Sequence, residues 1–293
     1  MLQTTEELLK VDNNNSYDTF KFKKKSGGTR EISAPHAYLK YRQEWIYHNI
    51  LKPYNSGASA AAYGFVVNKS ILDNARCHLN KKWLINIDLE NFFGTITREQ
   101  VYSCFSTMGY VDCVVEALTS ICTRYNVLPQ GAPTSPALSN IVCKELDSDL
   151  INYASSKGYS YTRYADDMTF SGDSADTIPP IREIYEIIVR YGFHINRHKT
   201  QIRKQGQKMR VTGLTVNDGV HVHRSYKKEV WRELHFCKRF TPEEHKLHIK
   251  ELFGQDTGYY KEWLLGRIMF IKSVDKECGQ KMLTRFNEIN WMF

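Results

Sequence analysis

The strongest constraint on the fold of this chain comes from two short apolar segments that carry aspartate. The segment 83–89 (WLINIDL) is apolar and rich in branched side chains, which is typical of a buried strand, and Asp88 lies at its end. The segment 159–172 (YSYTRYADDMTFSG) predicts two strands joined by a tight turn at Asp166 and Asp167, because Asp is depleted inside strands and common in turns. These segments predict a sheet with aspartates at the ends of its strands.

Carboxylates in such positions restrict the chemistry of the site. Next to an apolar core they are unfavourable unless they are solvated, hydrogen-bonded or neutralised by cations. Mg²⁺ is a suitable cation because it prefers oxygen ligands and is commonly shared between carboxylates and phosphates. Two such ions about 4 Å apart could stabilise both the attacking and the leaving oxygen of a phosphoryl transfer. Taken alone, an Asp-Asp pair at a hairpin tip also fits an ordinary turn.

The remaining pattern divides the chain into a mixed part and a helical part. Apolar and basic residues alternate around Gly27 and Gly28, which predicts a hairpin. The spacing of four residues predicts an amphipathic helix over 38–51: Leu39, Trp45, Ile46 and Ile50. Further helices are expected at 6–11, 98–108, 112–125, 137–155 and 178–191, and short strands at 208–216 and 220–223. Beyond Arg224 the pattern is helical, so we expect an α+β body followed by a small helical unit.

The positive charge of the chain is concentrated in its last hundred residues. Residues 194–293 contain 20 Lys and Arg against 11 Asp and Glu, a net charge of +9, whereas residues 1–193 carry −1 of the total of +8. A basic segment joined to a nearly neutral body is typical of a nucleic-acid-binding unit attached to a unit with another task. A merely soluble basic surface fits the charge equally well.

The cysteines and the hydropathy pattern exclude several classes of protein. The seven cysteines are scattered through apolar stretches without paired CxxC spacing, so neither a zinc site nor a disulfide framework is indicated. The ten histidines also lack metal-ligand spacing. No run of about 18 apolar residues is present, and the N-terminus lacks the layout of a signal peptide. We therefore expect a cytoplasmic protein that does not enter a membrane.

Several motifs in a fixed order bring the acidic sites together with other elements. Asp88 is followed five residues later by Phe93, then by LPQGAPTSP (128–136), YADD (164–167), GFHINRHKT (192–200) and VTGL (211–214). In this combination the chain resembles a reverse transcriptase from about residue 20 to residue 270. The resemblance implies a right-hand polymerase fold, with fingers and palm interleaved in 1–223 (fingers about 1–85 and 125–150) and a basic helical thumb in 224–293.

The resemblance also implies the catalytic and metal-binding residues. By this similarity the catalytic carboxylates are Asp88, Asp166 and Asp167. These carboxylates, with the backbone carbonyl of Leu89 as a further ligand, would hold two Mg²⁺ ions. Nucleotidyl transfer of this kind depends on positioning and electrostatics, so each carboxylate is expected to be essential.

Four further residues match positions that contact the incoming deoxynucleoside triphosphate in the family. Phe93 matches the aromatic residue that excludes a ribose 2′-hydroxyl by its bulk, although an ordinary core position is the alternative. Gln130 lies in a Pro/Gly turn that allows the backbone to approach the substrate. Arg30, in the basic hairpin, is placed like a residue that clamps the triphosphate, and Lys24 and Lys25 are nearby candidates. Lys199 matches a lysine near the leaving pyrophosphate and is either a general acid or a simple phosphate contact.

Two elements resemble hallmarks of the retron branch of the family. Residues 74–78 (NARCH) match its NAxxH element, which includes Asn74 and His78, and Val211, Thr212 and Gly213 match its VTG element at the position of the primer grip. The family associates both with its own structured RNA, whereas from chemistry alone His78 reads as a satisfied polar side chain. The end of the sequence at Phe293 leaves no room for a ribonuclease H or maturase extension, which favours a retron enzyme over a group II intron enzyme.

The retron resemblance implies specific partners. The protein would bind a structured non-coding RNA, start DNA synthesis from a guanosine 2′-hydroxyl in it, make branched single-stranded DNA (msDNA), and serve antiphage defence together with a separate effector protein. Five basic residues of the expected thumb could face the RNA: Lys227, Lys228, Arg232, Lys238 and Arg239. The alternatives are a group II intron-like enzyme, a catalytically silent RNA-binding scaffold and, less well matched, a Mg²⁺-dependent nuclease.

Overall fold

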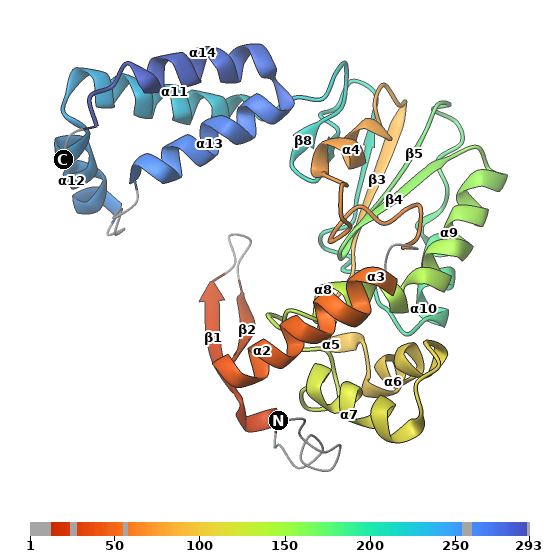
Figure 1. Ribbon diagram of the computed structural model, residues 1–293. Helices are drawn as coiled ribbons and strands as arrows, with labels where there is room; N and C mark the ends of the chain where they lie inside the picture. Colours follow the sequence, from red (N-terminus) through yellow and green to blue (C-terminus); the bar gives the residue numbers. More distant parts are fainter. Residues whose placement is uncertain (1–12, 24–27, 55–57, 254–259, 292–293) are drawn as a thin grey trace.

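The computed structural model describes residues 13–23, 28–54, 58–253 and 260–291. These residues form an N-terminal hairpin with helices beside it, a central sheet, and a C-terminal bundle of helices, which lie in that order around a curved molecule (Figure 1). The architecture is the mixed helical and antiparallel one that the sequence predicts. The expected helix at 6–11 lies outside the described residues.

The N-terminal hairpin consists of β1 (Tyr17–Lys23) and β2 (Thr29–Pro35). The two strands are antiparallel and in register from the pair Tyr17–Pro35 to the pair Lys23–Thr29, as the sequence predicts. Gly28, which precedes β2, has a φ of +79°, a conformation that glycine adopts without strain. A backbone hydrogen bond of 2.8 Å from the Ser33 N–H to the Gln130 carbonyl attaches the hairpin to the body.

The central sheet has the strand order β4-β5-β3-β6, and all neighbours are antiparallel. Its strands are β3 (Trp83–Asp88), β4 (Ser160–Tyr164), β5 (Asp167–Gly172) and β6 (Gln201–Lys204). The first three confirm the strands predicted from the two apolar segments. The edge strand β6 was not predicted, because its sequence QIRK is polar and most of it is exposed.

Helices cover the sheet and fill the space beneath it in Figure 1. They are α2 (Ala37–Ile46), η2 (Tyr47–Leu51), α3 (Lys52–Tyr54), α4 (Ile71–Arg76), α5 (Phe92–Thr95), α6 (Arg98–Thr107), α7 (Asp112–Cys122), α8 (Ser135–Val142), α9 (Lys144–Ser156) and α10 (Ile181–Arg190), and a short turn η1 (Asn13–Asn15) precedes β1. Local signals start some of them: Ser70 and Thr97 form capping boxes at α4 and α6. Alternation along β3 sends Trp83, Ile85 and Ile87 into the main core and Leu84 into a second one.

Four predictions about individual elements were wrong. The expected strand 220–223 is reduced to an isolated bridge between His221 and Thr215. The expected helix 137–155 is interrupted at Cys143, between α8 and α9. The expected strand 208–216 folds back on itself as β7 (Arg210–Val211) and β8 (Leu214–Thr215). Within α2, Trp45 does not join the apolar face, because its side chain is 53% exposed while Leu39 and Ile46 are buried.

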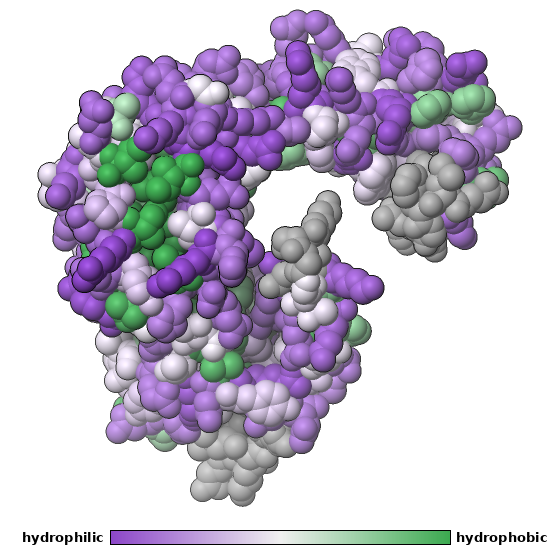
Figure 2. Space-filling model, turned by 180° about the vertical axis from the view of Figure 1, so that it is seen from behind, coloured by the Kyte–Doolittle hydropathy of each residue, from purple (hydrophilic) through white to green (hydrophobic). Residues whose placement is uncertain are grey.

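The C-terminal unit is helical, as predicted, and comprises α11 (Arg224–Arg239), α12 (Pro242–Phe253), α13 (Tyr260–Val274) and α14 (Lys276–Asn287). Its buried side chains join those of α4, β7 and β8 in the second core. Figure 2 shows an open hollow between this helical unit and the rest of the molecule. None of the helices in the described parts of the chain is long and apolar enough to cross a membrane.

Candidate active site

The three aspartates singled out in the sequence meet at one end of the central sheet. Tyr164 pairs with Asp167 across β4 and β5, which closes a two-residue turn of Ala165 and Asp166. Asp88, the last residue of β3, is the ladder partner of Asp167. Beyond the strand, the backbone N–H of Leu89 donates to the Asp166 carbonyl at 3.0 Å. Chain segments 80 residues apart therefore present three carboxylates within one turn and one strand end.

The hairpin turn is held in an unusual backbone conformation. Ala165 has a φ of +56°, a region that residues other than glycine rarely adopt. Gly64 packs directly on this turn, because a Cβ at that position would lie 2.6 Å from the Ala165 backbone nitrogen. A side chain at position 64 would therefore displace the turn that carries Asp166 and Asp167.

A lysine neutralises one of the carboxylates. The Lys199 Nζ lies 2.7 Å from an Asp88 carboxylate oxygen. Lys199 belongs to a turn whose first residue, Asn196, donates its backbone N–H to the Asp88 carbonyl at 2.7 Å. The segment that follows α10 is thus fixed to the end of β3, and its lysine points at the acidic site.

Burial and the neighbouring negative charges make the ionised forms of Asp166 and Asp167 less favourable. Burial, followed by the nearby negative charge of Asp88, raises the pKa of Asp166, against the opposing effect of Lys199 and Arg30. Although Asp167 is exposed at the hairpin tip, the surrounding protein and the charges of Asp166 and Asp88 raise its pKa to about 6. An added cation would relieve this repulsion.

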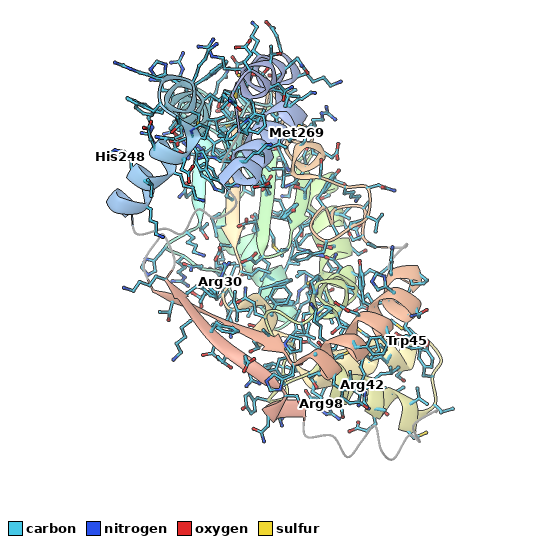
Figure 3. All side chains as sticks on the ribbon, turned by 60° about the vertical axis from the view of Figure 1, so that its left-hand side comes forward. Arg30, Arg42, Trp45, Arg98, His248 and Met269 are labelled. Atoms are coloured by element: carbon cyan, nitrogen blue, oxygen red, sulfur yellow. The ribbon has the colours of Figure 1, made fainter. Side chains whose placement is uncertain are left out.

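A pocket of about 590 Å³ opens beside the acidic site. Seven residues predicted for catalysis or nucleotide binding line it: Arg30, Asp88, Leu89, Phe93, Gln130, Asp166 and Lys199. Asp167 is not in its lining. Figure 3 shows Arg30 where the N-terminal hairpin approaches the central sheet. The structure thus brings a basic hairpin residue, a glutamine turn and the acidic strand ends around one cavity, whereas Lys24 and Lys25 lie outside the described residues.

An aromatic wall borders the pocket. The Phe93 ring lies 5.2 Å from the Phe92 ring and 6.3 Å from the Phe65 ring, centroid to centroid. Phe92 is buried and stacks on Phe193, whereas Phe93 is only half-buried and faces the pocket. Phe65 was not predicted; it is 44% exposed and has a φ of +61°, and its only sequence signal is the glycine before it.

Arg124, a residue that the sequence did not single out, also attaches the N-terminal hairpin to the body of the protein near the Gln130 turn. The Arg124 guanidinium donates to Thr19 Oγ1 at 3.0 Å and to Ser33 Oγ at 2.8 Å, so it joins both hairpin strands to the body. A Cβ on Gly131 would lie 2.7 Å from the Ser33 carbonyl oxygen, and its φ is +125°. Glycine is therefore required where the turn meets β2.

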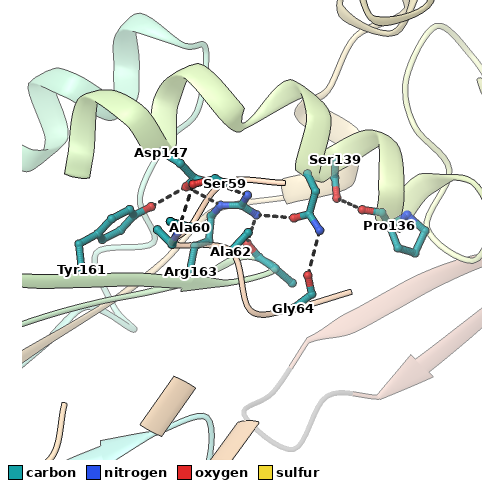
Figure 4. A network of polar contacts seen from close by, with 12 residues as sticks. Ser59, Ala60, Ala62, Gly64, Pro136, Ser139, Asp147, Tyr161 and Arg163 are labelled. Atoms are coloured by element: carbon teal, nitrogen blue, oxygen red, sulfur yellow. Dashed lines mark hydrogen bonds and ion pairs between the residues drawn. The ribbon is translucent and has the colours of Figure 1, made fainter. Parts of the chain in front are cut away.

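A buried ion pair joins β4, the first strand of the acidic hairpin, to helix α9 (Figure 4). Arg163, two residues before Ala165, donates to both carboxylate oxygens of Asp147 at 2.8 and 2.7 Å, and both side chains are fully buried. Tyr161 donates to the same carboxylate at 2.9 Å, and Asn140 accepts from Arg163 at 3.1 Å. The sequence signal for this network is an arginine inside a predicted strand next to the acidic turn, because a buried arginine requires a partner.

The residues predicted from the NAxxH element lie in the interior. His78 is fully buried and hydrogen-bonds Ser171 and Thr162 at 2.7 Å each, so it links α4's end to β4 and β5. Burial lowers the pKa of His78 to about 3, so its ring is neutral. Asn74 is 1% exposed. These positions do not support a direct RNA contact by either side chain, and they agree with the polar, satisfied interpretation of His78.

The VTG element forms the turn between β7 and β8. Val211 is buried in the second core, whereas Gly213 is exposed at the turn. Thr212 has a φ of +46°, and its hydroxyl donates to the Ile71 carbonyl of α4 at 3.4 Å. The VTG turn therefore contacts α4, the helix that carries the first residues of the NAxxH element.

The basic residues of the helical unit that were predicted to face RNA differ in whether they form ion pairs within the protein. Lys227 and Lys238 form ion pairs with Asp275 at 2.6 Å and with Glu288 at 2.9 Å. Arg232 is exposed and approaches Glu233 only at 3.5 Å. Lys228 and Arg239 are exposed and, among the described residues, have no carboxylate within 4.0 Å. Arg232, Lys228 and Arg239 are thus the better placed for an external anion.

Comparison with known proteins agrees with this arrangement. The family model described as "Reverse transcriptase (RNA-dependent DNA polymerase)" matches residues 22–216, which span the hairpin, the pocket and the central sheet. The chain belongs to the reverse transcriptase family.

Curated relatives place this reverse transcriptase in the bacterial retron branch. It is 35% identical over 264 residues to the retron Ec86 reverse transcriptase of Escherichia coli, covering 89% of this chain and 76% of the relative. It is 31% identical to the retron Mx65 reverse transcriptase of Myxococcus xanthus, covering 92% of this chain and 64% of the relative. The predicted retron membership is confirmed.

Solved structures share the fold at low sequence identity. The telomerase of Candida albicans, in complex with a fragment of telomeric RNA, aligns with a TM-score of 0.53 and 9% identity over 99% of this chain and 66% of that chain. Apo telomerase of Candida tropicalis aligns with a TM-score of 0.51 and 14% identity over 73% of this chain and 56% of that chain. The predicted polymerase fold is confirmed.

The donor chemistry of the site suits a hard divalent cation. Within the described ranges, no group of three or more His, Cys, Asp or Glu side chains is arranged to share one ion. The carboxylates at the sheet end are nevertheless oxygen donors, as Mg²⁺ requires, and burial together with the neighbouring negative charges raises the pKa values of Asp166 and Asp167. The residues present therefore fit the cation predicted from the sequence.

Proposed function

We propose that this reverse transcriptase copies RNA into DNA at the site formed by Asp88, Asp166 and Asp167. The observation that carries the proposal is the meeting of these carboxylates beside a pocket that also contains Arg30 and Lys199. A nucleoside triphosphate needs cationic groups for its phosphates and acidic groups for divalent ions. The pocket offers both kinds of group.

We assign metal binding to the three aspartates and the Leu89 carbonyl. Two Mg²⁺ ions bound there would activate the primer hydroxyl and neutralise charge on the leaving pyrophosphate. Arg30 would hold the triphosphate from the fingers side. Lys199, released from Asp88, would contact the pyrophosphate or protonate it.

We assign selection of the sugar to Phe93 and support of the nucleotide to Gln130. Phe93 is held by the buried Phe92 beside it, so its ring is in a position to exclude a 2′-hydroxyl by contact. Gln130 is held by the hydrogen bond between its own carbonyl and Ser33 of the fingers. Both residues line the same pocket as the carboxylates.

We propose further that the protein binds a structured non-coding RNA and makes branched msDNA primed from a guanosine 2′-hydroxyl, in the cytoplasm, as part of an antiphage system with a separate effector. The retron relatives support this proposal. Lys228, Arg232 and Arg239 of the thumb, with Gly213 of the VTG turn, are the groups most accessible to RNA. Asn74 and His78 would act indirectly by fixing α4 and the palm strands.

We propose the division of the chain into fingers and palm (1–223) and thumb (224–293). The proposal is supported by the start of α11 at Arg224, after its N-cap His223. The retron relatives argue against a group II intron-like enzyme, so a silent scaffold is the remaining alternative. Intact carboxylates, Phe93 and Gln130 argue against the scaffold.

A coexpression experiment tests the proposal. The protein is expressed with its flanking native DNA, and copurifying nucleic acid is treated with ribonuclease and run on a denaturing gel. A discrete DNA band that shifts on debranching, and is absent from the Asp166→Asn/Asp167→Asn double variant, is expected. RNA without DNA in both samples would point to the scaffold.

A further inference from the structure

The outward face of helix α2 carries three aromatic side chains that the proposed function does not use. Tyr38, Tyr41 and Trp45 are 52%, 68% and 53% exposed. The opposite face of the same helix is anchored in the main core through Leu39 and Ile46. The buried face therefore anchors the helix, and the three rings remain exposed.

The three rings form a continuous stripe along the helix. Residues three and four positions apart lie on one face of an α-helix, and here they are separated by about 4.5 and 6 Å along the axis. We call Tyr38, Tyr41 and Trp45 the α2 aromatic face. The Arg42 guanidinium lies 4.2 Å from the Tyr38 ring centroid, so this ring already stacks with a planar cation.

The charge around these rings suits an anionic partner. The helical segment 37–54 contains Lys40, Arg42 and Lys52 but only one acidic residue, Glu44. Glu44 is itself paired with Lys40 at 3.7 Å. The α2 aromatic face therefore combines flat apolar surfaces with a net positive charge, which is the combination used to bind single-stranded nucleic acid.

We propose that the α2 aromatic face binds an unpaired RNA strand by stacking of its bases. The proposal rests on the proposed function, in which RNA is the template. A duplex does not fit, because its bases are stacked about 3.4 Å apart and do not offer their faces to protein rings. A protein partner would also use Tyr, Trp and Arg, but the excess of basic residues and the purely aromatic stripe favour RNA.

The bound strand would lie outside the nucleotide pocket. Arg42 and Trp45 lie at a distance from Arg30 in Figure 3, and no residue of α2 lines the pocket. Helix α2 follows the fingers strand β2 after His36 alone, so a strand held on α2 remains close to the fingers. The α2 aromatic face would thus hold RNA that is not engaged in catalysis.

The test measures binding of the full chain to two hybrids of the same sequence. One hybrid of RNA template and DNA primer is blunt, and the other has an unpaired 5′ RNA overhang of about 12 nucleotides. Trp45→Leu keeps an apolar side chain but removes the ring, whereas Trp45→Phe keeps a stacking surface. In fluorescence anisotropy, Trp45→Leu is expected to weaken binding of the overhang hybrid about 10-fold and Trp45→Phe less than about 3-fold. Neither variant is expected to change binding of the blunt hybrid.

Two controls locate the effect. Tyr110→Leu removes an exposed ring outside α2, which is 38% accessible, and is expected to leave both affinities unchanged. An overhang that contains 5-iodouridine is expected to crosslink to the peptide that contains Tyr41 and Trp45. The proposal would be overturned if Trp45→Leu bound the overhang hybrid with wild-type affinity. It would also be overturned if this variant lost binding to a protein partner while its affinity for RNA stayed unchanged.

Failure of the proposed function gives a different result. It would appear as an absence of primer extension by the wild-type protein on the overhang hybrid, whose unpaired 5′ RNA is the template to be copied. Binding of the overhang is measured without nucleotides, so it does not depend on catalysis.

Discussion

Replacing Asp167 with Asn is expected to stabilise the protein while removing the activity that we propose. Asp167 is the ladder partner of Asp88 and the chain neighbour of Asp166. Partial loss of solvation by the surrounding protein and these two negative charges raise the pKa of its carboxyl to about 6. In an unfolded chain the same carboxyl titrates at about 3.9. The ionised form is therefore disfavoured by folding.

The size of the effect follows from this difference in pKa. About two units correspond to about 2.7 kcal/mol at a pH above both values. Because Asp167 is exposed at the hairpin tip, solvent screens much of the repulsion, and we expect about 1 kcal/mol. Since the folded-state pKa is the higher one, this stability is present below pH 4 and lost as the pH rises through 6. The Asn side chain does not ionise, so the Asp167→Asn variant does not lose this stability as the pH rises.

Urea unfolding followed by circular dichroism, in EDTA between pH 4 and 8, measures the difference. The Asp167→Asn variant is expected to exceed wild type by about 1 kcal/mol at pH 7.5 and to equal it near pH 4. Asp173→Asn is the matched control, because Asp173 lies just beyond the other end of β5, is 71% exposed, and pairs with Lys81. A variant that is less stable than wild type at pH 7.5, or a difference independent of pH, would refute the reasoning.

Four further predictions concern residues around the site. The pKa of His78 is about 3 in the folded protein and higher in the unfolded chain, so wild type is expected to lose up to about 2 kcal/mol of stability as the pH falls from 7 to 5. His78→Asn should reduce this loss, and thermal unfolding at both pH values checks it. Asp147→Asn should lower the free energy of unfolding by about 3–5 kcal/mol, measured in urea, because Arg163 is left buried without a countercharge. Phe93→Ala should increase ribonucleotide incorporation in primer extension at least about 10-fold, and unchanged discrimination would count against the steric role. Lys228→Glu should weaken RNA binding with a shallower salt dependence, and an unaltered slope would place the contact elsewhere.

The strands of the palm were predictable because their sequences are constrained by burial on both faces. WLINIDL and the segment around YADD have no alternative to a buried sheet, and their aspartates could only lie at strand ends. The pocket residues followed from the resemblance and converge around one cavity. The local sequence was therefore sufficient to predict which end of the sheet carries the aspartates.

Other features depend on contacts that no local pattern reveals. The periodicity of α2 counted Trp45 as apolar, but hydrophobicity does not say which of two faces meets the core, and Trp45 lies in solvent. Arg124 acquires its partners only when the N-terminal hairpin packs on the body, and Phe65 is placed by Gly64, which packs on the YADD turn. Lys227 looked like a free basic residue, yet folding brings Asp275 to it from 48 residues away.

The second core has a consequence for how the chain acquires its structure during synthesis. Leu84 and Val211 of the palm are covered by thumb side chains such as Leu234 and Ile268. A ribosome releases Leu84 and Val211 well before those helices, so these apolar side chains remain uncovered while translation continues. The interval between release of β8 and of α13 is therefore the period in which a nascent chain is most exposed to aggregation and to chaperones. Slow translation of residues 216–260 would lengthen it.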